Sequence, residues 1–378
     1  MPGSKILIVG AGLGGLTLAQ SLRSQGIDFE IFERDAGPQA RVQGWAVGLH
    51  KIIPVLQQIV PPEAPAIEST SVTAGHPGMD TVGWYDSKTG EPMDVGSIWV
   101  PGKSIRINRA KFRQYLLTGL PVKWGCHFTH YEIIEGGAVK ALFEDGTTAI
   151  GDILVGADGL RSRVRNTLYQ PNPPLLNTIP VGTVVGEITL NREQYERQAK
   201  LGRAFYIARE HGILFFVGLR GYSEDLSEGY FYWFTAFPDN KPEDSWINSA
   251  TQQELLSFTK NYLKGMHPDF REILDLQKPE GVSQAFILYD RVPEVCPDGP
   301  VTLIGDAAHP MTPFRGQGAN NAMEDAVDLG QKISEATKSG TSLSQALRAY
   351  EEAMVPRASQ MVLQSREVAL QLLEQADA

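Results

Sequence analysis

Hydrophobic residues near the start of the chain alternate between a short apolar run and a longer periodic stretch. Residues 6–9 (ILIV) are long enough for a buried strand and too short for a helix. Leucine and alanine then recur at helical spacing from about Gly14 to Leu22, and Gly26 ends the predicted helix. Residues 27–32 (IDFEIF) form the next predicted strand. The pattern therefore predicts a strand–helix–strand unit at the start of the chain.

A short apolar run followed by a glycine-rich turn occurs twice more. Residues 153–155 (ILV) lead into GADG, and residues 301–304 (VTLI) lead into GDAAHP. A long helix is predicted from Gly318 to about Lys338, and a final helix or helix pair over 343–373. These segments resemble the strand-and-helix succession of a parallel sheet.

The middle of the chain has a different pattern. After the proline-rich residues 171–174, residues 178–240 show imperfect period-2 alternation with many aromatic side chains. This pattern favours an antiparallel sheet, with short helices over 251–276. We therefore predict a second lobe inserted into the first domain.

The first glycine-rich turn has the spacing G-x-G-x-x-G at Gly10, Gly12 and Gly15. The first glycine permits a tight turn, the second lets the backbone approach a pyrophosphate, and the third lets the helix pack closely. Glu33 ends the second strand, where an acid can accept hydrogen bonds from a ribose. A purely structural glycine turn is the alternative, but strand, helix and acid all stand where a dinucleotide site needs them.

The three turns are expected to meet, because ligands collect at the carboxyl ends of strands in an open parallel sheet. Gly316, Gly318 and Ala319 leave room for a flat ring against the backbone, and Pro310 and Pro313 stiffen the loop before them. The helix that begins at Gly318 directs its amides toward that ring, which favours negative charge there.

Composition and charge exclude several classes of protein. With 42% hydrophobic and 21% charged residues, the 378-residue chain can bury one or two cores. A formal net charge of −10 disfavours binding to nucleic acid or anionic lipid. The only cysteines, Cys126 and Cys296, cannot form a disulfide framework, and the seven histidines show no metal-ligand spacing. Without a signal peptide or a membrane-length apolar stretch, the expected location is the cytoplasm.

Together these motifs resemble those of the class A flavoprotein monooxygenases, which share the p-hydroxybenzoate hydroxylase fold. The resemblance rests on GAGLGG, Glu33, Arg109, GADG with Arg163, and GDAAHP followed by PFRGQGAN. It covers residues 1–165 and 300–335, whereas the middle lobe matches only in general character.

The resemblance implies an α/β fold, with a Rossmann-like FAD-binding domain, an inserted antiparallel-sheet substrate lobe and C-terminal helices. The expected boundaries are 1–70, 101–172 and 285–340 for the FAD-binding domain, 71–100 and 173–284 for the substrate lobe, and 341–378 for the C-terminal helical segment.

By the same resemblance, the glycine turn would hold the FAD pyrophosphate, Glu33 the ribose, Arg109 the flavin side, and Asp306 the ribityl or pyrophosphate portion. Asp158 would belong to a motif that handles both FAD and NAD(P)H. The implied cofactor-binding residues are Gly10, Gly12, Leu13, Gly14, Gly15, Glu33, Arg34, Gly44, Ala46, Arg109, Asp158, Arg163, Gly305, Asp306, Pro313, Gly316, Gly318, Ala319 and Asn320.

The implied reaction is monooxygenation. NAD(P)H would reduce FAD, dioxygen would form a flavin C4a-hydroperoxide, and one oxygen atom would hydroxylate or epoxidise an aromatic or heteroaromatic substrate, as in secondary metabolism. A halogenase, a reductase, a nicotinamide-only dehydrogenase and a non-catalytic flavin-binding protein are the alternatives. The halogenase signature W-x-W-x-I-P is absent, since Val100 and Pro101 follow Trp99. The expected partners are the small-molecule substrate and dioxygen, without nucleic acid, and monomer and dimer are both open.

The sequence departs from the family pattern in two places. Trp45 is bulky where many relatives have a small residue, and it either walls the ring pocket or simply packs. The first strand of the middle lobe lacks the arginine of some phenol-oxidising relatives, and with the aromatic-rich lobe this favours a neutral polycyclic or indole-like substrate. Two sets of side chains are candidates for the substrate site. The substrate-binding candidates are Trp45, Phe215, Tyr232, Pro313 and Phe314, and the catalytic candidates are Tyr206, His211 and Tyr232. His309 is expected to position its motif rather than to transfer a proton.

Overall fold

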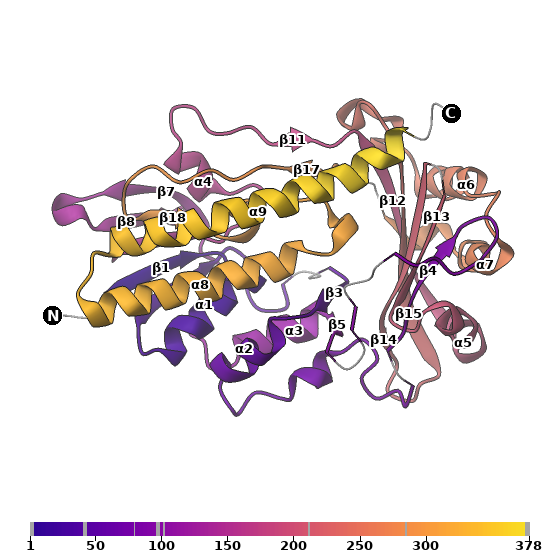
Figure 1. Ribbon diagram of the computed structural model, residues 1–378, viewed down its shortest axis with the longest axis horizontal. Coiled ribbons are helices and arrows are strands. Elements are labelled where there is room, and N and C mark those ends of the chain that lie inside the picture. The colour runs from indigo at the N-terminus through magenta and orange to yellow at the C-terminus, as the bar shows by residue number, and fades with distance from the viewer. Residues whose placement is uncertain are drawn as a thin grey trace.

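A computed structural model of the chain shows two sheets side by side, joined by a long C-terminal helix (Figure 1). It describes residues 4–40, 44–78, 80–95, 99–100, 103–210, 212–283 and 286–374.

The first sheet has five strands, all paired in parallel, in the order β18-β10-β1-β2-β6. They are β1 (Lys5–Val9), β2 (Asp28–Glu33), β6 (Val122–Trp124), β10 (Ile153–Gly156) and β18 (Val301–Leu303). The three strands that lead into glycine-rich turns, β1, β10 and β18, are neighbours. Their carboxyl ends therefore lie together, as the sequence pattern predicts.

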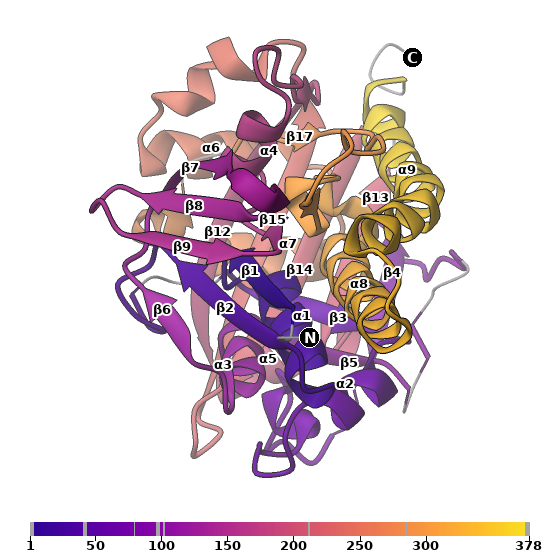
Figure 2. The same ribbon diagram turned by 90° about the vertical axis from the view of Figure 1, so that its left-hand side faces the viewer.

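Helices α1 (Leu13–Ser24) and α8 (Gly318–Ser339) pack against each other beside this sheet (Figures 1 and 2). A Cβ atom on Gly330 would lie 2.3 Å from the Ser21 hydroxyl, so the two helices approach closely at that glycine. Helix α9 (Leu343–Glu374) runs alongside α8. The last segment is therefore one helix and not a pair.

On its other side the parallel sheet meets a three-stranded antiparallel meander. It consists of β7 (Phe128–Ile133), β8 (Val139–Phe143) and β9 (Thr148–Gly151), and helix α4 (Arg163–Leu168) packs against β7. A separate ribbon of β3 (Ala46–Leu49) and β5 (Ile105–Asn108) lies between the two large sheets (Figure 1). Helices α2 (Ile53–Ile59) and α3 (Arg109–Leu117) flank α1.

The second large sheet, called the lobe sheet here, has the order β16-β12-β15-β14-β13-β4. All its pairs are antiparallel except β13 with β4. Its strands are β4 (Val82–Asp86), β12 (Val181–Asn191), β13 (Phe205–Glu210), β14 (Ile213–Tyr222), β15 (Glu228–Pro238) and β16 (Val282–Ser283). The antiparallel sheet predicted for residues 178–240 is thus present.

Three helices cover the outer face of the lobe sheet: α5 (Arg192–Leu201), α6 (Gln252–Tyr262) and α7 (Pro268–Leu276) (Figure 1). Helix α5 was not expected within the predicted sheet. It is specified locally, because the Asn191 side chain accepts from the Gln194 amide while the Gln194 side chain accepts from the Asn191 amide. This capping box starts a helix whatever the pattern of the flanking strands.

The two faces of the lobe sheet bury different sets of aromatic residues. Phe215 and Trp233 belong to the core beneath the outer helices. Phe216 and Tyr232, their neighbours in sequence, belong to a smaller cluster on the inner face, toward the first domain. The alternation follows from the period of two in a strand.

Helix α9 crosses from the first domain to the inner face of the lobe sheet (Figure 1). Ala369, near its end, is fully buried in the inner cluster. Arg366 makes two hydrogen bonds of 2.7 Å to the Asp290 carboxylate. Asp290 lies in β17 (Tyr289–Asp290), which pairs with β11 (Asn177–Thr178). Within the described ranges, no helix combines the length and apolar character needed to cross a bilayer.

Candidate functional site

The turn after β1 is tightly packed at two glycines and open at the third. A Cβ atom on Gly10 (φ +107°) would lie 2.4 Å from the carbonyl oxygen of Ala157, and one on Gly15 would lie 2.0 Å from that of Gly10. Around Gly12 no described atom comes within 4 Å of a Cβ position, and no described side chain caps the helix that begins at Leu13. The backbone amides of the first turn of α1 are thus accessible to a phosphate group.

Glu33 is held beside this turn at the end of β2. One carboxylate oxygen accepts from the Ala11 amide at 2.7 Å, and the other accepts from the Asp35 amide at 3.0 Å. Arg34 is exposed at the same strand end. Arg113 of α3, which was not predicted, is buried and donates to the Ala11 carbonyl at 3.0 Å. Glu33 and Arg113 therefore fix the glycine turn from two sides.

Asp306 lies in the short 3₁₀ turn after β18. Its carboxylate is 4.0 Å from the position of a Cβ atom on Gly318, at the start of α8. The Asp306 side chain is exposed to solvent. Desolvation by the surrounding protein nevertheless raises the pKa of its carboxyl group, whereas the nearby His309 and Arg109 lower that pKa. An accessible carboxylate beside a helix N-terminus and an arginine can accept hydrogen bonds from a polyhydroxyl chain.

Close backbone approach brings α1 and α8 together behind Asp306. A Cβ atom on Gly14 would lie 3.3 Å from the Ala322 carbonyl oxygen, and one on Gly305 (φ +57°) would lie 2.8 Å from the Ala322 Cβ. Ala319 packs against the same core. The glycines here serve helix packing as well as cofactor access.

A buried charge network supports the turn at Gly305. Asp325 of α8 is fully buried and accepts from His309 Nε2 at 2.6 Å, from the Gly305 amide at 2.8 Å, and from Arg357 of α9 at 2.6 Å. Burial disfavours both charges, yet the net effect of the pairing is to raise the pKa of His309 and lower that of Asp325. Sequence reasoning gave His309 a positioning role but found neither Asp325 nor Arg357.

The second motif uses its acid to begin a helix. Asp158 accepts from the Ser162 hydroxyl at 2.5 Å and from the amides of Arg163 and Val164 at 2.7 and 3.2 Å. Burial raises its pKa, and these hydrogen bonds oppose the rise. Asp158 therefore holds the turn that follows β10.

One predicted cofactor residue of this motif points elsewhere. The Arg163 guanidinium donates to Glu144 at 2.6 Å, on the outer meander. The buried arginine is Arg165, which donates to the carbonyls of Leu160 and Ala307 at 2.8 and 3.1 Å and so links the second and third motifs. The prediction for Arg163 is corrected, because the helical turn of α4 directs residues 163 and 165 to different sides.

The segment of residues 44–48 contacts both Arg109 and the start of α8. Gly44 has φ +83°, and a Cβ atom there would lie 3.6 Å from the Arg109 side chain. The Arg109 amide donates to the Trp45 carbonyl at 3.1 Å, and Asn320 of α8 donates to the Gly48 carbonyl at 2.8 Å. The structure thus places Arg109 beside Gly44 and Asn320 beside Gly48, along one short segment.

The approach to α8 is shaped by the turn Pro313–Arg315, which ends at Gly316 in the left-handed region with φ +62°. Ala46 begins β3 and packs on the inner face of the lobe sheet.

Glycine amides, Asp306 and an uncapped helix N-terminus fit the diphosphate and ribityl parts of FAD, and the small residues leave space for its ring.

Five aromatic residues gather on the inner face of the lobe sheet, and we call this set the aromatic face. Trp45 stacks on Tyr232 with ring centres 4.9 Å apart and planes at 12°. Phe216 lies 5.5 Å from Tyr232, and Phe234 lies 5.0 Å from Phe216 and 6.5 Å from Phe314. Trp45 therefore packs against the lobe sheet, and a role as a wall of the ring pocket stays a prediction.

Polar groups rim the aromatic face. The Trp45 indole N–H donates to Glu187 at 2.7 Å, and Arg220 pairs with the other oxygen of Glu187. Arg106, on β5, donates to the Tyr232 hydroxyl. Sequence reasoning missed Arg106, Glu187 and Arg220. Each is a single polar residue in a strand, and only the alternation of side chains between the two faces of the strand could have indicated that it lies beside the aromatic face.

Two predicted substrate-site residues lie on the wrong side of the lobe sheet. Phe215 is fully buried beside Trp233 in the outer core, and Tyr206 donates its hydroxyl to Gln198 in the same core. The alternation of the strands sends both away from the aromatic face, so these two predictions are corrected. His211, the third catalytic candidate, lies outside the described residues.

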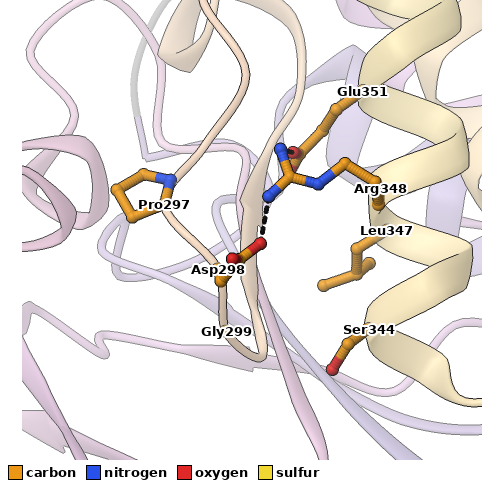
Figure 3. Close-up of a pocket in the computed structure, with 7 residues that line it drawn as sticks. All are labelled: Pro297, Asp298, Gly299, Ser344, Leu347, Arg348 and Glu351. Carbon is orange, nitrogen blue, oxygen red and sulfur yellow. Dashed lines mark hydrogen bonds and ion pairs between the residues drawn. The ribbon is translucent and has the colours of Figure 1, made fainter.

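A surface hollow of about 280 Å³ lies at the opposite, amino-terminal end of β18 (Figure 3). Arg348 of α9 pairs across it with Asp298. The hollow shares no residue with the site above. Its lining residues are Pro297, Asp298, Gly299, Ser344, Leu347, Arg348 and Glu351. The described part of the chain holds no group of three His, Cys, Asp or Glu residues suited to a metal.

Comparison with known proteins identifies a family. A model described as "FAD binding domain" matches residues 136–365, and one described as "NAD(P)-binding Rossmann-like domain" matches residues 8–52. The FAD-dependent monooxygenase thnD of Trichoderma harzianum is 37% identical over 385 residues, covering 96% of this chain and 92% of the relative. The FAD-dependent monooxygenase cctM of Talaromyces islandicus is 30% identical, covering 96% and 91%.

Solved structures share the fold at lower identity. A putative FAD-containing monooxygenase from Photorhabdus luminescens gives a TM-score of 0.78 at 23% identity, covering 98% of this chain and 99% of the other. The 2,6-dihydroxypyridine-3-hydroxylase of Arthrobacter nicotinovorans gives 0.77 at 19% identity, covering 98% and 92%. The arrangement of both large sheets is therefore a known one.

Proposed function

The chain belongs to the family of FAD-dependent monooxygenases, and on this premise we propose that it uses NAD(P)H and dioxygen to hydroxylate or epoxidise an aromatic or heteroaromatic small molecule. The family and the FAD cofactor are established by the matches above. The substrate class and the nicotinamide reductant are proposals.

The observation that carries the proposal is the position of the aromatic face. Trp45 belongs to the same short segment as Gly44 and Ala46, and the backbone of this segment contacts Arg109. The stacked pair Trp45–Tyr232 therefore joins the cofactor side to the lobe sheet. A flat apolar molecule can stack there, since offset aromatic pairs gain about 0.5–1.5 kcal/mol beyond area burial.

When bound, FAD supplies the redox chemistry, accepting hydride from the nicotinamide and activating dioxygen. The protein supplies binding and orientation. The first turn of α1 would bind the diphosphate, Glu33 the ribose, and Asp306 the ribityl chain. The amides at the start of α8 would stabilise negative charge on the ring, while Trp45 and Tyr232 would exclude water and hold the substrate ring.

Anaerobic reduction tests this proposal. The purified protein is mixed with NADPH or NADH, with and without polycyclic and indole-type aromatics, and flavin absorbance is followed before and after oxygen is added. We expect a yellow protein whose flavin is reduced at least about tenfold faster with a suitable aromatic, and oxygenated product after oxygen is added. Bound FAD without any aromatic-stimulated nicotinamide oxidation would indicate a non-catalytic flavoprotein.

A further inference from the structure

We propose that Arg106 determines substrate specificity by pairing with an ionised oxygen of the substrate, a phenolate or enolate, at the inner end of the aromatic face. The inference rests on the proposed function, because it concerns the same site. An anionic substrate replaces the neutral substrate that was expected because the first strand of the lobe lacks an arginine. The positive charge comes instead from β5, on the ribbon between the two large sheets.

Arg106 is buried, with only 6% of its surface exposed, and is enclosed by rings. Its guanidinium lies over Phe205 at 4.8 Å, over Phe216 at 5.2 Å and over Tyr232 at 6.0 Å from the ring centres. One terminal nitrogen donates to the Tyr232 hydroxyl, and Nε has no hydrogen-bond partner among the described residues. A buried donor is thus left unused next to the polar end of Tyr232.

Arg106 forms no direct ion pair with a carboxylate of the described residues. Among the residues that the structure describes, no Asp or Glu oxygen lies within 4.0 Å of its guanidinium. Asp80 interacts with it through space without forming an ion pair, and the Asp80 carboxylate accepts a hydrogen bond from the Thr73 hydroxyl. Within the described part of the chain, a positive charge in an aromatic enclosure therefore lacks an anion in direct contact.

Packing alone does not account for this arrangement. Contacts between a cation and aromatic rings are favourable, but they do not by themselves offset the desolvation cost of a buried charge that has no anion in direct contact. An anionic oxygen placed at Arg106 and the Tyr232 hydroxyl would remove that cost. The substrate hydroxyl would give its proton to water on binding, and the resulting oxyanion would donate electron density into the ring to be oxygenated.

Two probes of nearly the same shape test the proposal on the oxidised FAD holoenzyme without nicotinamide. The first is 4-nitrophenol, which ionises near neutral pH, and the second is 4-nitrotoluene, which does not ionise. We expect the Kd of 4-nitrophenol to fall about tenfold between pH 6 and pH 8, while that of 4-nitrotoluene stays constant.

Variants identify the residue responsible. Arg106→Met should reduce the pH dependence for 4-nitrophenol to less than about twofold, and Arg106→Lys should retain most of it. Arg209→Met, an exposed arginine on neighbouring β13, should behave as the wild type. Tyr232→Phe should weaken binding a few-fold but keep the pH dependence. Flavin absorbance and thermal unfolding confirm that each variant is folded.

Three results would overturn the proposal: a wild-type Kd for 4-nitrophenol independent of pH, the full pH dependence in Arg106→Met, or no binding of either probe. Flavin reduction by NADPH is measured separately on the same preparations. The monooxygenase assignment therefore stands or falls independently of Arg106.

Discussion

The edge of the parallel sheet and the aromatic face of the lobe sheet lie next to each other but are built in different ways. The sheet edge is made mainly of backbone, with glycines in close contact and buried charges behind them, as at Gly10 and Asp325. The aromatic face is made of side chains alone, as in the stack of Trp45 on Tyr232. A substitution at the first should therefore cost stability and cofactor, and one at the second should change substrate selection.

The largest effect is expected for Asp325→Asn. This change leaves His309 and Arg357 without their shared counter-ion in the interior, where breaking a buried pair costs about 3–5 kcal/mol. Denaturant unfolding measures the loss. Glu324→Gln is the matched control on the same helix, since this half-exposed acid also pairs with Arg357, and it should cost less than about 1 kcal/mol. Equal losses in both variants would contradict the supporting role of Asp325.

Asp306→Ala should lower FAD affinity at least about tenfold while leaving the apoprotein folded, because the Asp306 side chain is exposed to solvent and is not part of the packed core. Flavin absorbance after gel filtration measures occupancy, and denaturant unfolding of the apoprotein checks the fold. Full retention of flavin would argue against this position for the cofactor.

The buried pair also predicts a pH dependence. The folded-state pKa of His309 is raised above its ordinary value of 6.5, so its contribution to stability is complete below that value and is lost as pH rises through the raised pKa. Asp325, with a lowered pKa, loses its contribution only in strong acid. Unfolding free energy followed from pH 6 to 9 should fall in the wild type, and the slope should be smaller in His309→Gln. An unchanged slope would show that another group titrates.

The smallest effect on the molecule is expected for Trp45→Phe. A phenyl ring keeps the contact with Tyr232 but cannot donate to Glu187, a hydrogen bond worth about 1–2 kcal/mol at a half-buried site. FAD content should stay unchanged, while the KM for an aromatic substrate rises several-fold. Phe215→Leu, on the outer face, should leave the KM unaltered. Loss of flavin from Trp45→Phe would mean that the two regions are not separable.

Sequence reasoning succeeded where a feature is local. The strand, the glycine spacing and the acid at Glu33 lie within one continuous segment, and short apolar runs before two other glycine turns placed them on the same sheet edge. The family, the FAD cofactor and the mixed α/β fold are confirmed. The domain boundaries and the cofactor contacts of individual residues stay predictions.

The sequence did not reveal contacts that depend on strand parity or on distant packing. Phe215 and Phe216 are chemically identical, and only the register of β14 decides which one faces the site. Asp325, the partner of His309, is 16 residues away on α8, and Arg357, which also bonds to Asp325, is on α9, at no recognisable spacing. Arg106 lies in β5, within the predicted FAD-binding domain, but it donates to the Tyr232 hydroxyl of the lobe sheet. A search along the lobe strands could therefore not find it.

The path of α9 limits how this protein can be recombined with its relatives. Its last turns contribute Ala369 to the inner cluster and Arg366 to Asp290, although the helix begins beside α8. A lobe exchanged by transplanting only the inserted segment would meet a foreign helix end at its inner face. Chimeras that alter substrate choice therefore need the lobe and the end of α9 taken from the same parent.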